Sequence, residues 1–207
     1  LTQYQGRALM SVAVVNSGGA NIASVLHALG RLGAEPRFTD DPDVIRKADR
    51  VILPGVGAAG HAMDVLGKRN LIGVIKQLEQ PVIGICLGMQ LLFESSEEDD
   101  AQLLGLIPAR LKKIPQQIGL RVPHMGWNAI ENTGEDHLNA TLGGKWFYFV
   151  HSYAAPIGPW TLSTSQHGVT FSAIVRKNNF YGAQFHPERS ASAGASLLRR
   201  FLETPLP

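Results

Sequence analysis

The sequence has little of what marks secreted, membrane-spanning or nucleic-acid-binding proteins. It has one cysteine among 207 residues, which excludes an internal disulfide framework and favours a reducing compartment, with the cytoplasm as the default. Its longest largely apolar stretch, about 81–93, is broken by glycines and is too short to span a bilayer. The net charge is +2, and the basic residues are dispersed rather than clustered. We therefore expect no membrane and no nucleic acid as partner.

The composition predicts one ordinary globular domain. Hydrophobic residues make up 44% and charged residues 17% of the chain, and this length allows a sizeable core. Residues 1–9 show no clear periodicity and precede a convincing first strand, so we interpret them as a probable expression leader. We found no repeat or linker beyond them, so residues 10–207 are expected to form a single domain.

Strands alternate with helices in the first half of the chain. Strands are predicted at 12–16, 36–39, 51–53 and 81–85, and helices at 21–32, at 42–48 behind a capping Asp41, and within 59–78. This alternation predicts an α/β fold with a largely parallel central sheet flanked by helices. After residue 100, short strands are predicted at 120–130, 145–150, 160–164, 169–175 and 180–185, with a final helix at 191–202.

The only cysteine has the surroundings of a reactive nucleophile. Cys86 stands between Gly84 and Gly88, after the apolar run 81–85 and before the helix-prone run 89–93. This pattern is typical of a nucleophile elbow, in which glycines leave the space that side chains would fill. The first turn of a helix also stabilises a thiolate. A lone cysteine is more often a small core residue, but the flanking glycines disfavour that interpretation here.

A second motif offers the base that a thiol nucleophile needs. His186 follows an aromatic strand, and Pro187 should keep the chain extended, so that His186 and Glu188 point the same way. A carboxylate beside an imidazole orients it as a base. A histidine near an acidic residue often occurs by chance, but together with the elbow this motif predicts a Cys-His-Glu site. Zinc is the other use of such residues, and no C-x-x-C or H-x-x-x-H spacing supports it.

Loops after other strands should meet the cysteine at the same sheet edge. The peptide of Gly55 and Val56, together with the N–H of Leu87, makes a plausible oxyanion hole, although loop 53–58 taken alone is equally well an ordinary turn. The strand end at 151–153 carries three polar side chains that suit a small zwitterion, or are simply exposed. Loop 16–21 lacks both the G-x-G-x-x-G spacing and a Walker lysine, which argues against nucleotide binding.

These motifs together resemble class I glutamine amidotransferases, and more narrowly the glutaminase subunit of imidazole glycerol phosphate synthase in histidine biosynthesis. The widely shared motifs are 54–57, 84–90 and 184–188, and the more specific ones are 19–22, 123–128, 148–153 and 188–190. The likeness extends from Met10 to about Leu202. It implies a flavodoxin-like domain with extra antiparallel strands in its C-terminal half.

The resemblance also implies roles for individual residues. Cys86 corresponds to the nucleophile, His186 to the general base and acid, and Glu188 to the group that orients His186. The glutamine pocket would be formed by Gly55, Gly57, Gln90, Glu98, His151, Ser152 and Tyr153. The family uses no metal and no organic cofactor in this reaction.

The implied partner is a cyclase with a (β/α)₈ barrel, in a heterodimer. Ammonia passes to this cyclase, which makes imidazole glycerol phosphate and aminoimidazole carboxamide ribotide. The positions that face the cyclase in the family are matched by Asn21, Trp127, Asn128, Tyr148 and Arg189.

Two alternatives follow from the same motifs. The chain could be the glutaminase subunit of another pathway, such as pyridoxal phosphate, purine or anthranilate synthesis, but the run 123–128 argues against this. It could instead be an inactive, regulatory glutaminase-like module, or a stress protein with a reactive elbow cysteine. The presence of both His186 and Glu188 disfavours both interpretations.

Overall fold

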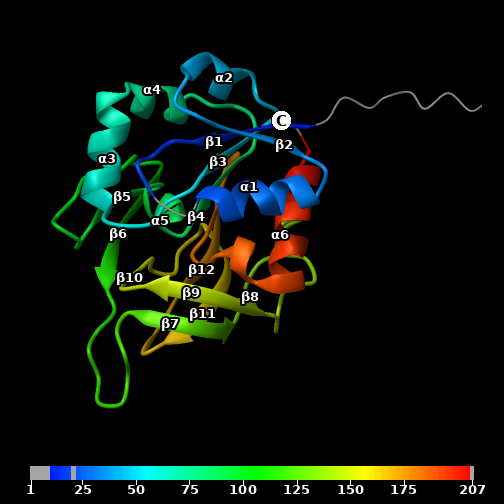
Figure 1. Cartoon of the computed structure of the whole chain (residues 1–207). Coiled ribbons are helices and arrows are strands. Elements are labelled where there is room, and N and C mark those ends of the chain that lie inside the picture. Colours follow the sequence, from blue (N-terminus) through cyan, green and yellow to red (C-terminus); the bar gives the residue numbers. More distant parts are fainter. Residues whose placement is uncertain (1–9, 20–21, 206–207) are drawn as a thin grey trace, which may run out of the picture.

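A computed structural model describes residues 10–19 and 22–205 and shows an eight-stranded sheet with helices on both faces (Figure 1). The strand order is β2-β1-β3-β4-β13-β12-β11-β8. The predicted leader, residues 1–9, and Asn21 lie outside the described residues. None of the helices in the described ranges is long and apolar enough to cross a membrane.

The first five strands in this order are parallel, as the alternating pattern predicts. They are β2 (Glu35–Thr39), β1 (Ser11–Val15), β3 (Arg50–Leu53), β4 (Val82–Ile85) and β13 (Phe180–Ala183). The helices between them are α1 (Ile22–Arg31), α2 (Pro42–Lys47), α3 (Ala59–Lys68) and α4 (Leu71–Lys76). The predicted cap of α2 is confirmed, because the side chain of Asp41 accepts a hydrogen bond from the N–H of Asp43.

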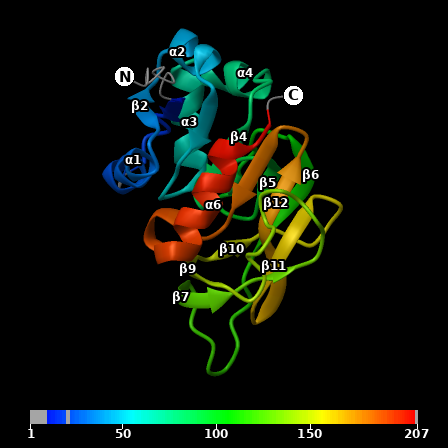
Figure 2. The same cartoon turned by 90° about the vertical axis from the view of Figure 1, so that its right-hand side faces the viewer.

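Antiparallel strands extend this sheet, and two smaller sheets follow it, one of them with both parallel and antiparallel pairs and the other antiparallel (Figure 2). The extension consists of β12 (Val169–Lys177), β11 (Thr161–His167) and β8 (Glu131–Asn132). The smaller sheets are β10 (Tyr153–Ala154), β6 (Ile107–Lys113) and β5 (Phe93–Ser96), and the pair β7 (His124–Ala129) and β9 (Trp146–His151). The largely parallel α/β fold with added antiparallel strands is therefore confirmed.

Two local predictions are wrong. The run 89–93 was expected to be helical, but α5 (Leu87–Gln90) has only one turn, and Phe93 already begins β5. Buried side chains and pairing of β5 with β6 override helix propensity there. The strand predicted over 120–130 begins only at His124, since Pro123 has no N–H to give to a ladder.

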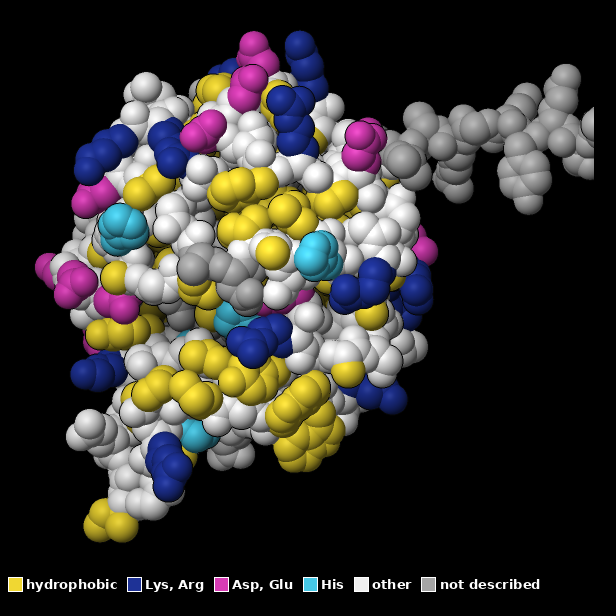
Figure 3. All heavy atoms as spheres, viewed as in Figure 1, with side chains coloured by type: hydrophobic (Ala, Val, Ile, Leu, Met, Phe, Trp, Pro, Cys, Tyr) yellow, Lys and Arg dark blue, Asp and Glu magenta, His cyan; other side chains and the backbone are white. Residues whose placement is uncertain are grey.

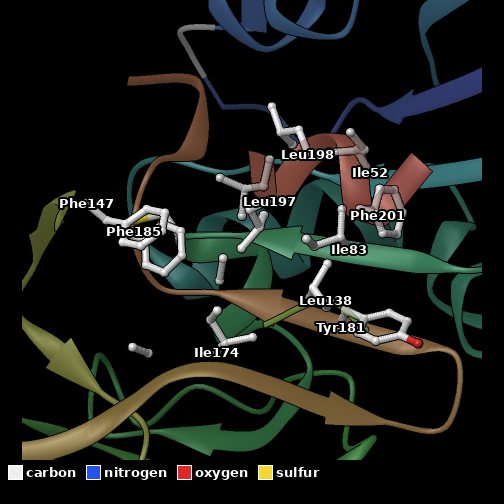
Figure 4. Close-up of a cluster of buried hydrophobic side chains, with 14 of the residues drawn as sticks. Ile52, Ile83, Leu138, Phe147, Ile174, Tyr181, Phe185, Leu197, Leu198 and Phe201 are labelled. Atoms are coloured by element: carbon white, nitrogen blue, oxygen red, sulfur yellow. The ribbon is translucent and has the colours of Figure 1, made fainter. Parts of the chain in front are cut away.

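Each face of the sheet has its own hydrophobic core. On one face α1 and α6 (Ala191–Glu203) cover Ile83 and Ile174, and Phe147 stacks on Phe185 with ring centroids 4.0 Å apart (Figure 4). On the other face α2, α3 and α4 cover the sheet with residues such as Leu66. Strand β4 is buried on both sides. Two covered faces leave the strand ends as the place for a site.

Glycines allow α5 to pack directly on the end of β3. A Cβ on Gly88 would overlap the carbonyl oxygen of Leu53, and a Cβ on Gly84 would overlap the carbonyl oxygen of Gly88. Both obstacles are backbone atoms, which cannot move without shifting a strand or the helix. The space argument from the sequence is therefore confirmed at both glycines.

We expect Gly88→Ala to lower the free energy of unfolding by at least about 3 kcal/mol, because the added methyl group meets backbone. The control is Gly30→Ala in α1, where nothing lies within 4 Å of the new Cβ, so stability should rise by up to about 1 kcal/mol. Denaturant unfolding of both variants measures the difference. Equal stability of the two variants would contradict the packing argument.

Candidate active site

Cys86 sits in a strained conformation at the turn between β4 and α5. Its φ of 52° and ψ of −107° are unfavourable for a residue with a side chain. Its N–H donates to the carbonyl of Ala183 at 2.8 Å, and its carbonyl accepts from the N–H of Gln90 at 3.2 Å. These two hydrogen bonds hold the strained residue in place, so the predicted elbow geometry is confirmed. The short helix adds less dipole than the sequence suggested.

His186 and Glu188 are in contact, although not for the predicted reason. The distance from His186 Nδ1 to Glu188 Oε1 is 2.8 Å, and both side chains are buried. The chain is extended at His186 but then forms a single 3₁₀ turn over Pro187–Arg189, so the expected straight segment is wrong. Ser190 stabilises the turn, because its Oγ donates to the carbonyl of His186 at 2.6 Å. The turn, rather than strand alternation, brings the carboxylate to the ring.

The surroundings of His186 favour its charged form. Burial alone lowers the pKa of His186, but hydrogen bonds with Cys86 and Glu188 outweigh burial and raise this pKa to about 10. The ring is therefore protonated at neutral pH and lies between a sulfur atom and a carboxylate. Such an imidazolium can hold the thiol proton and later deliver it to a leaving group.

A cavity of about 300 Å³ opens beside the sulfur. It is lined by Val56, Gly57, Cys86, Leu87, Gln90, Glu98, Pro123, Val150, His151, Ser152, Tyr153 and His186. The structure thus brings nearly all predicted pocket residues to one cavity with Cys86 and His186. Gly55 is not among the lining residues and instead packs against Leu87 and Gly88. That contact keeps the glycine loop next to the first turn of α5.

The predicted oxyanion donors lie on the same wall of this cavity. Leu87 is the first residue of α5, so its N–H has no carbonyl partner within the helix. Val56 lines the cavity beside it. Gly57, with a φ of 102°, uses a backbone conformation that favours glycine. The N–H of Leu87 is therefore left without a helical partner at the cavity that contains the sulfur.

Glu98 is fixed at the cavity wall by a helix terminus. Its Oε2 accepts a hydrogen bond of 2.7 Å from the N–H of Ala59, the first residue of α3. The carboxylate thereby satisfies one of the N–H groups that the start of a helix leaves without a partner. The role of Glu98 as a partner for a substrate ammonium group stays a prediction.

Gln184 is a site residue that the sequence analysis missed. Its Nε2 lies 3.8 Å from Cys86 Sγ, and its Oε1 accepts a hydrogen bond of 3.1 Å from Gln90 Nε2. The side chain is fully buried. A signal was available, because Gln184 precedes His186 by two residues in an extended segment, which puts both side chains on the same side.

Three of the predicted partner-facing residues form one surface cluster. The edge of Trp127 meets Tyr148 with ring centroids 6.2 Å apart, and the Arg189 guanidinium lies 5.2 Å from the centre of the Tyr148 ring. Trp127 is 50% exposed, and Met125 and Trp146 beside it are more exposed. Hydrophobic side chains gather on the lower part of the face in Figure 3, where Figure 1 places β7 and β9. Such a patch is typical of an interaction surface.

Comparisons with known proteins show the family to which this chain belongs. A family model described as "Glutamine amidotransferase class-I" matches residues 13–204. The imidazole glycerol phosphate synthase subunit HisH of Escherichia coli K12 is 50% identical over 94% of this chain and 100% of its own length. The HisH subunit of Idiomarina loihiensis is 48% identical over 95% and 100%. A crystal structure of a glutamine amidotransferase from Thermotoga maritima shares the fold, with a TM-score of 0.66, 17% identity and coverage of 93% and 96%.

We expect the pKa of His186 to fall by at least about one unit in Cys86→Ala, because the hydrogen bond and charge of the sulfur that raise it are removed while burial remains. Cys86→Ser keeps a hydrogen-bonding atom and should give a smaller decrease. Nuclear magnetic resonance of the ring between pH 5 and 11 measures both values. An unchanged pKa in the alanine variant would show that sulfur does not contact the ring.

The raised pKa of His186 also makes the stability of the fold depend on pH. Because the folded value, about 10, is raised above an unfolded value of about 6.5, protonated His186 stabilises the fold fully below pH ~6.5. This contribution declines above that pH and is lost as the pH rises through about 10.

Proposed function

We propose a mechanism and a partner for this chain from the premise that it belongs to the class I glutamine amidotransferases, and within them to the HisH subunits of imidazole glycerol phosphate synthase. Its reaction is the hydrolysis of L-glutamine to L-glutamate and ammonia in histidine biosynthesis. One observation carries the mechanism. The only thiol of the chain interacts with an imidazole whose Nδ1 lies 2.8 Å from a buried carboxylate.

In the first half of the reaction the thiolate of Cys86 attacks the carbon of the glutamine side-chain amide. The imidazolium of His186 then gives its proton to the departing nitrogen, which leaves as ammonia, and a thioester remains. Glu188 keeps the ring oriented and favours its charged form. In the second half His186 takes a proton from water, the hydroxide attacks the thioester, and glutamate leaves as the thiol is restored.

Negative charge on the amide oxygen would be stabilised by backbone N–H groups. We assign this role to Leu87 and to the peptide of Gly55 and Val56. The contact of Gly55 with Leu87 and the position of Val56 at the cavity support the assignment. In this proposal the loop 55–57 must rotate a peptide before it donates, and a glycine with a φ of 102° permits such a change.

The rest of glutamine would be bound by the polar wall of the cavity. Ser152, Tyr153 and Glu98 all line the cavity, and together they offer hydrogen-bonding groups and a carboxylate that suit an α-carboxylate and an α-amino group. Gln90, whose amide is held by the Tyr153 carbonyl and by Gln184, completes the pocket. Gly57 and His151 are the other pocket residues in this proposal.

The partner we propose is the cyclase subunit, which is a (β/α)₈ barrel and receives the ammonia in a heterodimer. The cluster of Trp127, Tyr148 and Arg189 is the proposed contact surface, since exposed Trp and Arg are favoured anchors at interfaces. Asn128 is assigned to the rim of that surface, although its amide already donates to the carbonyl of Gln166. Arg189 follows Glu188 directly, so binding of the cyclase at Arg189 can change the position of the catalytic residues.

We also propose that the chain acts in the cytoplasm. The catalytic thiol must stay reduced to attack an amide, and a reducing compartment keeps it so. No metal or organic cofactor has a role in these steps.

We expect Cys86→Ala to lower glutamine hydrolysis at least about 1,000-fold, because the nucleophile is removed. Glutamate release is measured with the cyclase present, and binding of the cyclase should remain. Since Cys86 is the only thiol, iodoacetamide should add one adduct to the parent chain, abolish activity, and add none to the variant. Glutamine should slow the labelling. Activity retained in the variant would exclude the mechanism.

We expect Arg189→Ala to weaken binding to the cyclase about tenfold, as loss of an interfacial arginine does. The matched control is Arg37→Ala, which removes an exposed cation from the edge strand β2, far from β7 and β9 (Figure 1). Sedimentation with the purified cyclase and stimulation of glutamate release measure the two effects. If the parent chain forms no complex at micromolar concentration, the partner assignment fails even where Cys86 proves catalytic.

A further inference from the structure

Two buried histidines take no part in the proposed proton transfers, one in the wall of the glutamine pocket and one next to it. His124 on β7 and His151 at the end of β9 are paired across the two-stranded ladder. His124 Nδ1 is 3.0 Å from His151 Nε2, and both residues are about 95% buried. His151 reaches the cavity, whereas His124 does not line it.

The outer partners determine which ring nitrogens carry hydrogen. His151 Nδ1 is 2.9 Å from the carbonyl oxygen of Tyr153, and a carbonyl only accepts, so this nitrogen is the donor. In a neutral ring the other nitrogen, Nε2, must then accept, and the donor beside it is His124 Nδ1. The Nε2 of His124 is left to accept from the Asn128 amide at 3.4 Å. The hydrogen bonds therefore run in one direction, from Asn128 through both rings to Tyr153.

Neutral rings are what the surroundings favour. Burial, with a smaller effect from His167, lowers the pKa of His124 to about 4. Burial is also the main cause that lowers the pKa of His151 to about 3, against the hydrogen bond to Tyr153. Both rings thus have one donor and one acceptor nitrogen at neutral pH.

The chain of hydrogen bonds continues to the nucleophile. The carbonyl oxygen of Tyr153 also accepts from Gln90 Nε2 at 3.0 Å. Gln90 in turn donates to Gln184, whose amide lies 3.8 Å from the sulfur of Cys86. The Tyr153 carbonyl is therefore held by two donors, and one of them, His151, is oriented by His124.

We propose that His124 is a positioning residue for glutamine hydrolysis. Its Nδ1–H holds neutral His151 in the tautomer and orientation that fix the Tyr153 carbonyl, and through that carbonyl it fixes Gln90. This inference rests on the proposed glutamine pocket. His124 touches neither the substrate nor the reacting atoms.

The competing explanation is that His124 only packs. Its ring stacks on Phe149 at 4.8 Å and on His167 at 4.0 Å between centroids. Two substitutions separate the roles. His124→Phe keeps an aromatic ring and loses the donor, whereas His124→Asn loses the ring and keeps an N–H one bond from Cγ, where Nδ1 stands.

The test is steady-state glutamine hydrolysis by each variant in complex with the cyclase. We expect His124→Phe to raise the KM for glutamine at least tenfold, with a smaller change in kcat, and His124→Asn to keep KM within about threefold of the parent. If His124 only packs, His124→Asn should raise the KM for glutamine more than His124→Phe does. That order, or a phenylalanine variant with the KM of the parent, overturns the inference.

The control is His167→Phe. It makes the same chemical change in the same stack, but His167 contacts the carbonyl of Arg121 rather than His151. Its KM should be that of the parent, and a rise equal to that of His124→Phe would assign the effect to the stack.

Two further measurements test folding of the variants and the tautomer of His151. Thermal unfolding of each variant shows whether it folds, and ¹⁵N resonance of the parent chain shows whether His151 carries its hydrogen on Nδ1. Hydrogen on Nε2 would overturn the inference even if His124→Phe does not fold. If the parent chain hydrolyses glutamine and the His124 variants have the same KM as the parent, only this inference is refuted. If Cys86→Ala is active, the proposed function is refuted.

Discussion

The close contact between the first turn of α5 and the end of β3 is the constraint on which the site depends. The carbonyl of Leu53 occupies the space where a side chain of residue 88 would stand. Because the two backbones touch, the loop that follows β3 is held beside the residue that follows β4. The thiol of Cys86 and the glycine loop therefore share one wall of the cavity, and each is positioned by the strand before it.

Two histidines that line the cavity are held in different charge states by their neighbours. His186 lies against a carboxylate and a sulfur, which favour the cation despite burial. His151 lies against a carbonyl and another histidine, and burial prevails there. One side chain type thus supplies a proton at one position and a fixed neutral hydrogen-bond pattern at another. The difference comes from the partners of each ring, which are Glu188 and the sequence-distant sulfur of Cys86 for His186 and a carbonyl and a second histidine for His151.

Local patterns predicted much of this arrangement. Glycines at 84 and 88 and the strand before them identified the elbow, and strand ends brought loops 54–57 and 151–153 to the cysteine. The patterns gave the wrong local structure where contacts with other parts of the chain determine the backbone conformation. Residues 91–93 favour a helix, but Phe93 pairs with β6, and the turn after His186 depends on Ser190. His124 acquires its contacts only through tertiary neighbours, so no local spacing distinguished it, whereas the spacing of Gln184 to His186 was a local signal.

The size of the cavity limits what can reach the sulfur. About 300 Å³ is the volume of roughly ten water molecules in the liquid, which is room for one free amino acid with little solvent around it. A glutamine within a polypeptide carries backbone on both sides and exceeds this volume. An enzyme that cleaves amides with a cysteine would damage other proteins if its site were a long open groove. The small cavity therefore favours free glutamine over the glutamine side chains of proteins.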